Sequence, residues 1–367
     1  MNKNDLLAAK SAICAQLLQL GLGGQVIGKR ATFSVASAVA SASRNVHAVG
    51  IGKKVSTNKK SSEDCVRIYV VQKLPRSLMS PRDVIPESIN GIPTDIIEAE
   101  PAFAFAKKKP SKAKKPAKPK KKPAALAHAT DVAGTTSGTQ APQRPVIGGI
   151  SAGHRDITAG TLGCFCHSTN PGDDPDQLFA LSNNHIFANV NQAILGDPLY
   201  QPGPGDGGGF NDYFANLQRY IPISLGGLVS NRVDAAIGSP LSSVPVNPVI
   251  DQIGTISGTL TVKEGMKIRK QGRRTGYTEG VVDDADMTVF VGMDRNDTSA
   301  VAKFENQFRI VSEDSRPIGL GGDSGSLIVH RTQDKAVGLY FAGPDSGEYG
   351  VANPIDFVLQ DLEISIP

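Results

Sequence analysis

From Val146 to Pro367, short apolar runs recur between glycine-rich turns, and this rhythm restricts the possible folds more than any other feature. Short runs at close intervals are typical of a β-barrel or β-sandwich and not of alternating βαβ units. The clearest helix pattern of this region lies near its end, at residues 354–362. The sequence therefore predicts a mainly β body. Its predicted strands include residues 162–165, 178–181, 233–237, 259–262, 287–291, 327–329 and 337–341.

The chain divides by composition into four regions. Residues 1–45 combine a helix pattern at 1–21 with a Ser/Ala-rich stretch, and residues 146–367 form the β body. Between them, residues 46–105 predict a small α+β module and residues 106–145 a linker. With 367 residues, the chain is long enough for two domains or a double-barrelled one. The strand-like runs of the module are residues 46–51, 66–71 and 94–97.

The positive charge of the chain is concentrated in the linker. Residues 107–122 hold ten lysines and no acid, so without them the net charge of +4 becomes −6. The composition therefore does not favour a nucleic-acid-binding fold. A Lys/Pro/Ala-rich segment buries too little apolar surface to offset chain entropy, so we expect the linker to be disordered and extended. A solvated tether is the simpler interpretation, and a polyanion-binding or targeting arm is the alternative.

Other compositional features predict a cytoplasmic protein without a metal or cofactor. Four cysteines in 367 residues do not make a disulfide framework, and no apolar run is long enough for a transmembrane helix. The N-terminus lacks the pattern of a secretory signal. Cys164, Cys166 and His167 form the nearest approach to a metal site, but no second ligand pair at zinc-finger spacing accompanies them. They are better explained as residues of a strand.

The sequence Gly-Gly-Asp-Ser-Gly-Ser at residues 321–326 directly precedes the predicted strand 327–329. A nucleophilic serine needs a hydroxyl at a tight turn and backbone N–H groups that stabilise an oxyanion. Glycines permit the unusual backbone geometry of such a turn. Ser324 is therefore a candidate nucleophile, with the N–H groups of Gly322 and Ser324 as oxyanion-hole donors. Taken alone, the motif fits a polar turn between strands equally well.

A histidine and an acid complete a possible catalytic set. His185 follows the apolar run 178–181, and Asp234 lies inside the apolar run 233–237. A buried carboxylate is costly unless it is paired and hydrogen-bonded, so Asp234 would need a partner such as His185. Separately, a structural histidine and an exposed edge-strand acid would explain these residues. Together with Ser324 they give the chain order His, Asp, Ser, which is that of chymotrypsin and differs from subtilisin and the α/β-hydrolases.

On these residues, 146–367 resembles the trypsin-fold serine peptidases. It is most similar to a non-secreted group that includes bacterial trypsin-like peptidases and the plant narrow-leaf-type protease, and residues 46–100 resemble the module that often precedes them. The resemblance implies two six-stranded antiparallel β-barrels with the active site between them, divided near residues 245–255. The matching segments are 160–163, 181–185, 201–204, 231–236, 272–276, 322–326 and 353–356.

The resemblance also assigns roles to residues. Ser324 would attack the scissile carbonyl, His185 would act as general base and then acid, and Asp234 would orient His185. Ile318 would form the floor of the substrate pocket, with residues 346–350 as one wall. The opposite wall would be Phe341, Ala342 and Gly343. An apolar floor implies a preference for hydrophobic side chains, unless Glu348 points inward.

Two departures from the family bear on location and activation. Ile186 stands where secreted members carry a disulfide-forming cysteine, which agrees with an intracellular setting. In zymogen-type relatives, the acid that corresponds to Asp323 pairs with a newly freed amino terminus. Residues 146–149 resemble such a terminus faintly, but Pro145 would resist cleavage after Arg144. An ordinary first strand and a constitutively formed site are the preferred interpretation.

Two classes of function remain open from the sequence. The first is a serine endopeptidase that hydrolyses protein or peptide substrates through an acyl-enzyme. The second is a protease-fold binding or scaffold protein whose triad is idle or masked. Because no triad residue is substituted, the endopeptidase is favoured. The N-terminal module would cover the cleft, recruit substrates or mediate assembly, including a possible homo-oligomer, and recruitment or assembly is preferred because a flexible linker does not enforce masking.

Overall fold

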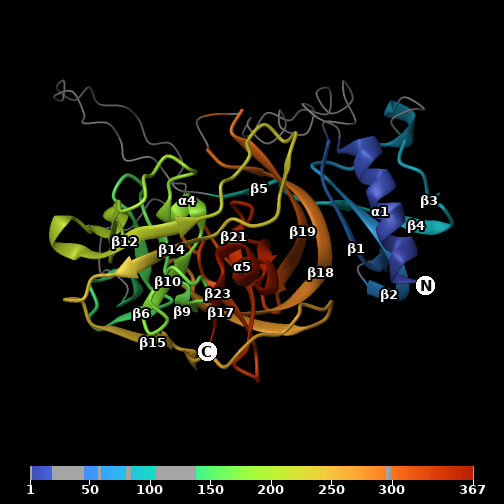
Figure 1. Ribbon diagram of the computed structural model, residues 1–367. Helices are drawn as coiled ribbons and strands as arrows, with labels where there is room; N and C mark the ends of the chain where they lie inside the picture. The colour runs from blue at the N-terminus through green and yellow to red at the C-terminus, as the bar shows by residue number, and fades with distance from the viewer. Residues whose placement is uncertain are drawn as a thin grey trace, which may run out of the picture.

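The computed structural model describes residues 2–18, 45–56, 59–79, 84–104, 138–294, 297 and 299–366 (Figure 1). Residues 105–137, which include most of the predicted linker, lie outside these residues, as does the Ser/Ala-rich stretch that follows the first helix. Residues 138–145 were predicted to be part of the disordered linker, but they are held against the body: the Gln143 N–H donates to Gln201 Oε1 at 2.9 Å and the Thr139 hydroxyl donates to the Arg273 carbonyl at 3.1 Å. Within the described residues, the chain is mainly β, with two barrel-like halves and a smaller N-terminal module. The predicted fold class is confirmed in this respect.

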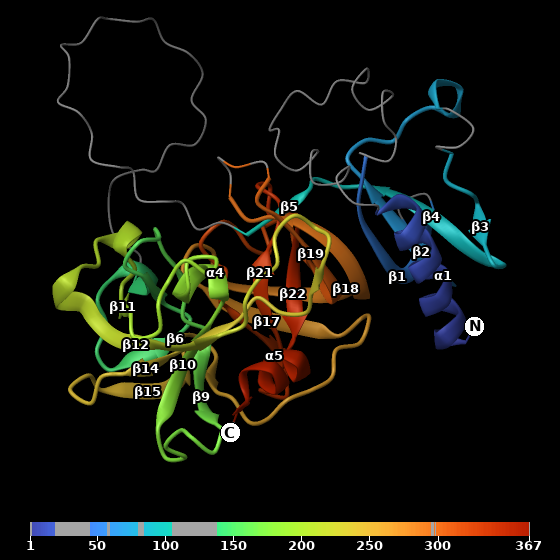
Figure 2. The ribbon, with the colours of Figure 1, turned by 45° about the horizontal axis from the view of Figure 1, so that its top comes forward.

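The first half is an antiparallel sheet of eight strands that curls around a core of buried aliphatic and phenylalanine side chains. A one-turn helix, α4 (Asn184–Phe187), follows strand β10 and points into the region between the two halves (Figure 2). In sheet order the strands are β23 (Ile364–Ser365), β9 (Cys164–Ser168), β10 (Leu178–Ser182), β14 (Ala236–Pro240), β12 (Tyr213–Tyr220), β11 (Pro198–Tyr200), β7 (Ser151–His154) and β8 (Gly160–Thr161).

The second half is a closed barrel of six antiparallel strands. Within the barrel, each strand pairs with two others, and the ring closes where β18 pairs with both β17 and β19. Helix α5 (Ile355–Leu362) follows the last barrel strand and confirms the helix predicted at 354–362. Around the ring the strands are β17 (Lys267–Gly272), β18 (Gly276–Gly292), β19 (Val301–Ser312), β22 (Tyr349–Pro354), β21 (Ala336–Ala342) and β20 (Leu327–His330).

Short elements connect the two halves. A three-stranded sheet joins β6 (Val146–Gly148), β15 (Val246–Ile250) and β16 (Gly254–Thr255), so residues 146–148 are part of a paired strand. Strand β13 (Ser230–Asn231) extends the second half beside β19. The 3-10 helices are η2 (Arg76–Leu78), η4 (Gly138–Gln140), η5 (Pro204–Asp206) and η6 (Phe210–Asp212).

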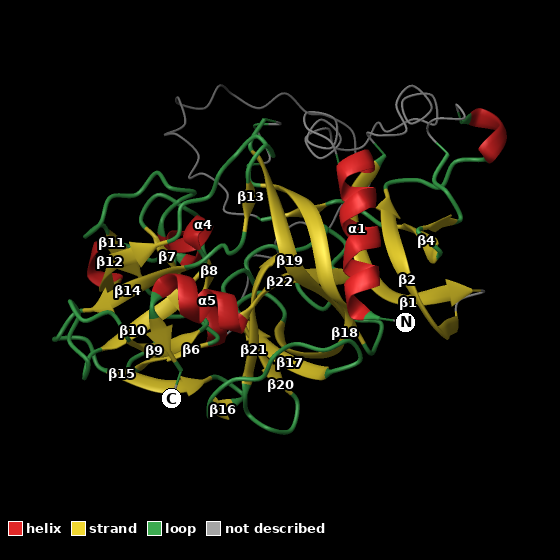
Figure 3. Ribbon diagram, turned by 45° about the vertical axis from the view of Figure 1, so that its right-hand side comes forward, coloured by secondary structure: helices red, strands yellow, loops and turns green. Residues whose placement is uncertain are grey.

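The N-terminal module shares a sheet with the second half. Strand β1 (Val46–Ser56) pairs antiparallel with β18, with Ala48 opposite Val289. Helix α1 (Lys3–Leu17) covers one face of β1 and β2 (Lys59–Val70), as Figure 3 shows. Because the module and barrel share backbone hydrogen bonds, the module is attached through its sheet and not only through the linker. The remaining strands are β3 (Ser88–Ile89), β4 (Ile92–Glu98) and β5 (Ala102–Phe103).

Buried charges lie at the joint between β1, β2 and β18. Arg67 is fully buried and donates to the Asp283 carbonyl at 2.8 Å, and Tyr69 donates to the Asp284 carboxylate at 3.1 Å. Burial raises the pKa of Asp284 to about 7, although the Arg67 charge opposes this shift. The carboxylate fits there because Gly50 of β1 has no side chain: a Cβ at Gly50 would lie 1.7 Å from Asp284 Oδ2.

Three local features differ from the sequence prediction. Strand β14 begins at Ala236, because the backbone N–H of Asp234 donates to the Asn353 side chain and not to a neighbouring strand. Residues 259–262 contribute only an isolated bridge from Thr259 to Ala336. Helix α4 was not predicted, since one turn is too short to show an apolar periodicity.

Gly50→Ala should destabilise the joint, because the new methyl group cannot coexist with the Asp284 carboxylate. We expect the free energy of unfolding to fall by about 1–3 kcal/mol, the usual cost of overpacking a well-packed interior. Gly209→Ala is the matched control, since a Cβ there meets nothing within 4 Å. Chemical denaturation of both variants measures the difference, and equal stabilities would contradict the described packing.

Candidate active site

His185 and Asp234 meet at the inner end of the first half. Strands β10 and β14 are neighbours, and Ser182 pairs with Ala236, which brings the residues just beyond these positions together. His185 Nδ1 lies 2.5 Å from Asp234 Oδ2, and the His185 backbone N–H donates to Asp234 Oδ1 at 3.1 Å. Both side chains are fully buried. The carboxylate therefore holds His185 through two contacts, one with the imidazole and one with the backbone N–H.

Three amides hold Asp234 in place. Asn183 donates to the Asp234 carbonyl at 2.7 Å, and the Asp234 N–H donates to Asn353 Oδ1 at 3.1 Å. Asn353 belongs to β22 of the second half and donates in turn to Gln307 Oε1 at 2.6 Å. Asn183 and Asn353 lie in the matching segments 181–185 and 353–356, whereas Gln307 was not singled out from the sequence. Asn353 and Gln307 thus position a residue of the first half from the second half.

Ser324 lies in a glycine turn that presses against the first half. Gly322 and Gly325 have positive φ angles of 108° and 96°, which favour glycine at both positions. A Cβ at Gly325 would lie 2.0 Å from the Thr161 carbonyl oxygen and 2.3 Å from Ser182 Oγ. The Thr161 N–H donates to the Ser324 carbonyl at 2.7 Å. The turn thus reaches the strands that precede His185.

The Ser324 hydroxyl donates to the Phe341 carbonyl at 3.1 Å. His185 Nε2 is buried and has no hydrogen-bond partner among the described residues. The structure thus brings His185 into contact with Asp234, and it pairs the Ser324 hydroxyl with Phe341 and not with His185.

The two predicted oxyanion-hole donors, Gly322 and Ser324, lie on this turn. Within the described ranges, the N–H of neither residue donates a hydrogen bond, whereas the N–H groups of Asp323, Gly325 and Ser326 all do. Unpaired N–H groups in a buried turn are uncommon in proteins. Both donors belong to the turn that carries Ser324.

Asp323 anchors the turn from beneath. Its fully buried carboxylate lies 3.5 Å from Lys270 Nζ and accepts hydrogen bonds from the N–H groups of Leu320 and Arg274, both at 2.8 Å. Thr275 adds a hydroxyl donor at 2.8 Å. Burial alone would raise the pKa of Asp323, but the charge of Lys270 and these donors hold the pKa below its usual value. Burial in turn lowers the pKa of Lys270.

The predicted substrate pocket contains a tyrosine ring. Ile318 is fully buried, and its N–H donates to the Gly347 carbonyl at 2.9 Å. Ile318 packs in the same core cluster as Tyr340, whose ring approaches three glycines. A Cβ would lie 2.7 Å from this ring or its hydroxyl at Gly319 and Gly343, and 2.3 Å at Gly350. Phe341 and Ala342 are also buried and pack in the adjacent cluster.

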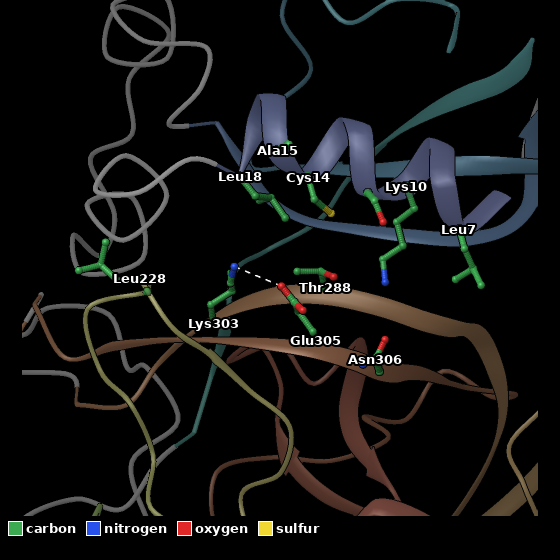
Figure 4. A pocket seen from close by; sticks show the side chains of 12 residues that line it. Leu7, Lys10, Cys14, Ala15, Leu18, Leu228, Thr288, Lys303, Glu305 and Asn306 are labelled. Carbon is green, nitrogen blue, oxygen red and sulfur yellow. Dashed lines mark ion pairs between the residues drawn. The ribbon is translucent and has the colours of Figure 1, made fainter. Parts of the chain in front are cut away.

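Two cavities lie away from these residues. One of about 640 Å³ lies between α1 and the strands β18 and β19, and Figure 4 shows Cys14 and Lys10 on its helix side. The other, of about 470 Å³, is lined by residues of the module such as Ile85. Neither is lined by His185, Asp234 or Ser324.

The described residues include no group of three or more His, Cys, Asp or Glu side chains that could hold a metal. Cys164 and Cys166 point into the core from β9, while His167 Nδ1 lies 3.2 Å from the Pro175 carbonyl oxygen. No helix in the described part of the chain has the length and apolar character needed to cross a membrane.

No family model matches the chain, and no curated protein matches it. Among solved structures, the chain is similar to Thermobifida fusca protease A and Nocardiopsis protease. Each has 16% identity and a TM-score of 0.41, and the alignment covers 60% of this chain and 97% of that one. A chymotrypsin from Cellulomonas bogoriensis has 13% identity and a TM-score of 0.39 over 60% of this chain and 98% of that one. These values do not assign the chain to a family, and the fold described above follows from its own strand pairing.

Lys270→Met should destabilise the protein strongly, because it leaves the Asp323 carboxylate buried without its cation. We expect a loss of about 3–5 kcal/mol in the free energy of unfolding. Lys303→Met is the matched control: Lys303 pairs with the half-exposed Glu305, and such surface pairs contribute about 0.2–1 kcal/mol. Urea denaturation of both variants tests the assignment, and a loss below 1 kcal/mol for Lys270→Met would contradict it.

Proposed function

We propose that the chain is a serine endopeptidase with Ser324 as nucleophile and His185 and Asp234 as its catalytic partners. The observation that carries the proposal is the buried contact of His185 Nδ1 with Asp234, which leaves His185 Nε2 without a partner among the described residues. The contacts of Gly325 with Thr161 and Ser182 support a short separation between the Ser324 turn and the imidazole.

The reaction follows from these groups. His185 Nε2 takes the proton from Ser324 Oγ as the oxygen attacks the peptide carbonyl, and it later donates that proton to the leaving amine. Asp234 keeps the second proton on Nδ1 and stabilises the imidazolium. The N–H groups of Gly322 and Ser324 stabilise the negative oxygen of the tetrahedral intermediate. Water then hydrolyses the acyl-enzyme by the reverse sequence, with His185 again as the base.

The hydrogen bond from Ser324 to Phe341 represents a resting state. Phe341 has one backbone carbonyl beside the hydroxyl, and the N–H of an extended substrate is a competing donor to it. A carbonyl oxygen can accept two hydrogen bonds, so a substrate N–H that donates to Phe341 weakens the bond from the Ser324 hydroxyl and favours donation of this hydroxyl to His185 Nε2. On this proposal, substrate binding itself prepares the nucleophile.

The site is proposed to form without cleavage of the chain. Lys270 supplies the positive charge that Asp323 needs, so no freed amino terminus is required. Residues 146–148 are paired in strand β6, which agrees with this interpretation. All four cysteines are free thiols, which supports the proposed reducing, cytoplasmic setting.

The four-region division also remains a proposal, with residues 146–367 as the peptidase body and residues 46–105 as a module attached to it. The shared sheet of β1 and β18 supports attachment of this module to the body. Protein or peptide substrates are the proposed partners, without nucleic acid or a membrane.

The apolar floor at Ile318 implied a preference for hydrophobic side chains in general. The position of the Tyr340 ring supports a narrower class of substrate. The ring approaches Gly319, Gly343 and Gly350, the positions that would otherwise leave room for a side chain. We therefore propose that the residue whose carbonyl is attacked has a small side chain, and that Tyr340 excludes large ones.

Ser324→Ala and Asp234→Asn test the reaction. Wild type should be labelled by a small fluorophosphonate, whereas Ser324→Ala should not be. Asp234→Asn should slow peptide hydrolysis roughly 10⁴-fold, the scale observed when the carboxylate of such a triad becomes an amide. Ser326→Ala is the control for labelling, because its hydroxyl donates within the turn to the Asp323 carbonyl. A wild type that resists labelling while folded would favour the alternative, a protease-fold scaffold.

Tyr340→Val should open the space that the ring occupies. We expect kcat/KM for a peptide with phenylalanine at the attacked residue to rise at least about tenfold relative to one with alanine. Tyr340→Phe keeps the ring and should retain the preference for alanine. A peptide-library profile of the three proteins measures this, and an unchanged preference in Tyr340→Val would rule out the role of the ring.

A further inference from the structure

A segment of the N-terminal module pairs with the strand edge beside Ser324. The Phe103 N–H donates to the Gly343 carbonyl at 3.0 Å, and the Gly343 N–H donates to the Phe103 carbonyl at 3.1 Å. This exchange of two hydrogen bonds is the pattern of an antiparallel pair. Phe103 ends strand β5, which also runs parallel to β18.

Gly343 follows Phe341 by two residues, just beyond the end of β21. Residues two apart in a strand point their N–H and C=O groups in the same direction and lie about 7 Å apart. Phe341 directs its carbonyl to the Ser324 hydroxyl, and Gly343 directs both of its groups to Phe103. Because the pairing is antiparallel, the chain after Phe103 is directed toward Phe341 and the nucleophile.

Further contacts hold the segment 100–104 at this edge. Tyr349 donates to the Glu100 carbonyl at 2.5 Å, and the Ala104 N–H donates to the Gly292 carbonyl at 3.0 Å. Ala102 and Ala104 are fully buried and pack with Phe341 in one core cluster. The segment therefore docks as an extended peptide through its backbone and through small apolar side chains.

An extended substrate would need the same edge. A peptide whose carbonyl reaches Ser324 must pass Phe341, and strand addition to an open edge is the common way in which extended peptides gain backbone hydrogen bonds. At Gly343 both groups that such a peptide would use are already bonded to Phe103.

We propose that residues 100–104 are an intramolecular competitor that occupies the substrate-binding edge at Gly343, so that a peptide substrate must displace them before it is cleaved. This inference rests on the proposed function, because it identifies the edge by its distance from the nucleophile. It gives the N-terminal module a role that depends on its docking at this edge. The competitor blocks extended peptides and leaves Ser324 open to a small reagent.

Phe103→Pro tests the competition in the full chain, because proline lacks the N–H that donates to Gly343. Loss of this hydrogen bond, together with strain in the Phe103–Gly343 pair, should weaken the competitor. We therefore expect KM for an extended peptide to fall about fivefold to tenfold, with kcat nearly unchanged. The rate of labelling by a small fluorophosphonate should stay the same. Phe103→Ala is the matched control: it keeps both backbone hydrogen bonds and should retain most of the wild-type KM. Thermal unfolding of both variants confirms that they are folded.

The outcomes separate this inference from the proposed function. If Phe103→Pro is folded and labelled but has an unchanged KM, the competitor is overturned and the endopeptidase stands. If wild type and variant both resist labelling and cleave no peptide, the proposed function fails and the competitor fails with it.

A second measurement keeps the proposal testable if Phe103→Pro does not fold. Hydrogen exchange of residues 100–104 is compared in wild type after reaction with a small fluorophosphonate and with a peptidyl boronate. Displacement predicts faster exchange of the Phe103 amide only with the peptidyl reagent. Equal protection with both reagents would show that the segment is a permanent part of the fold.

Discussion

The position of the candidate base depends on one buried carboxylate, that of Asp234. A buried carboxylate requires partners for its lone pairs, and His185 supplies two of them through its backbone N–H and its imidazole. The backbone of Asp234 is held from the opposite half by Asn353. The two halves therefore cannot separate without releasing Asp234, and the geometry of His185 depends on their association.

Two other buried carboxylates are stabilised in different ways. Asp323 has a cation, Lys270, and several N–H and O–H donors, so its pKa stays below the usual value. Asp284 has Tyr69 and backbone donors but is more weakly compensated, so burial raises its pKa to about 7. These differences match the positions of the two carboxylates. Asp323 anchors the Ser324 turn, whereas Asp284 lies at the joint between the module and the second half. Only the first must keep its charge in order to hold the turn.

The sequence was informative where local pattern determines structure. Apolar runs predicted strands such as β10, β20 and β21, and the glycines around Ser324 predicted a turn whose φ angles are positive at Gly322 and Gly325. A buried acid needs a partner, and this requirement predicted the contact of Asp234 with His185. Contacts between distant segments left no such signal: Lys270 in an otherwise ordinary strand gives no indication that it lies 3.5 Å from Asp323.

The attachment of the N-terminal module shows why the rest could not be predicted. A linker expected from its composition to be flexible favoured a role in recruitment or assembly over masking, because a tether permits contact without enforcing it. Such a tether would be the only connection between the module and the body. The pairing of β1 with β18 is a second connection, and it is made by backbone groups whose partners the sequence does not specify. With both connections present, the chain between β4 and the linker has little freedom, and residues 102–103 pair with β18 of the shared sheet. The restriction that places Phe103 beside Gly343 is therefore a consequence of the shared sheet.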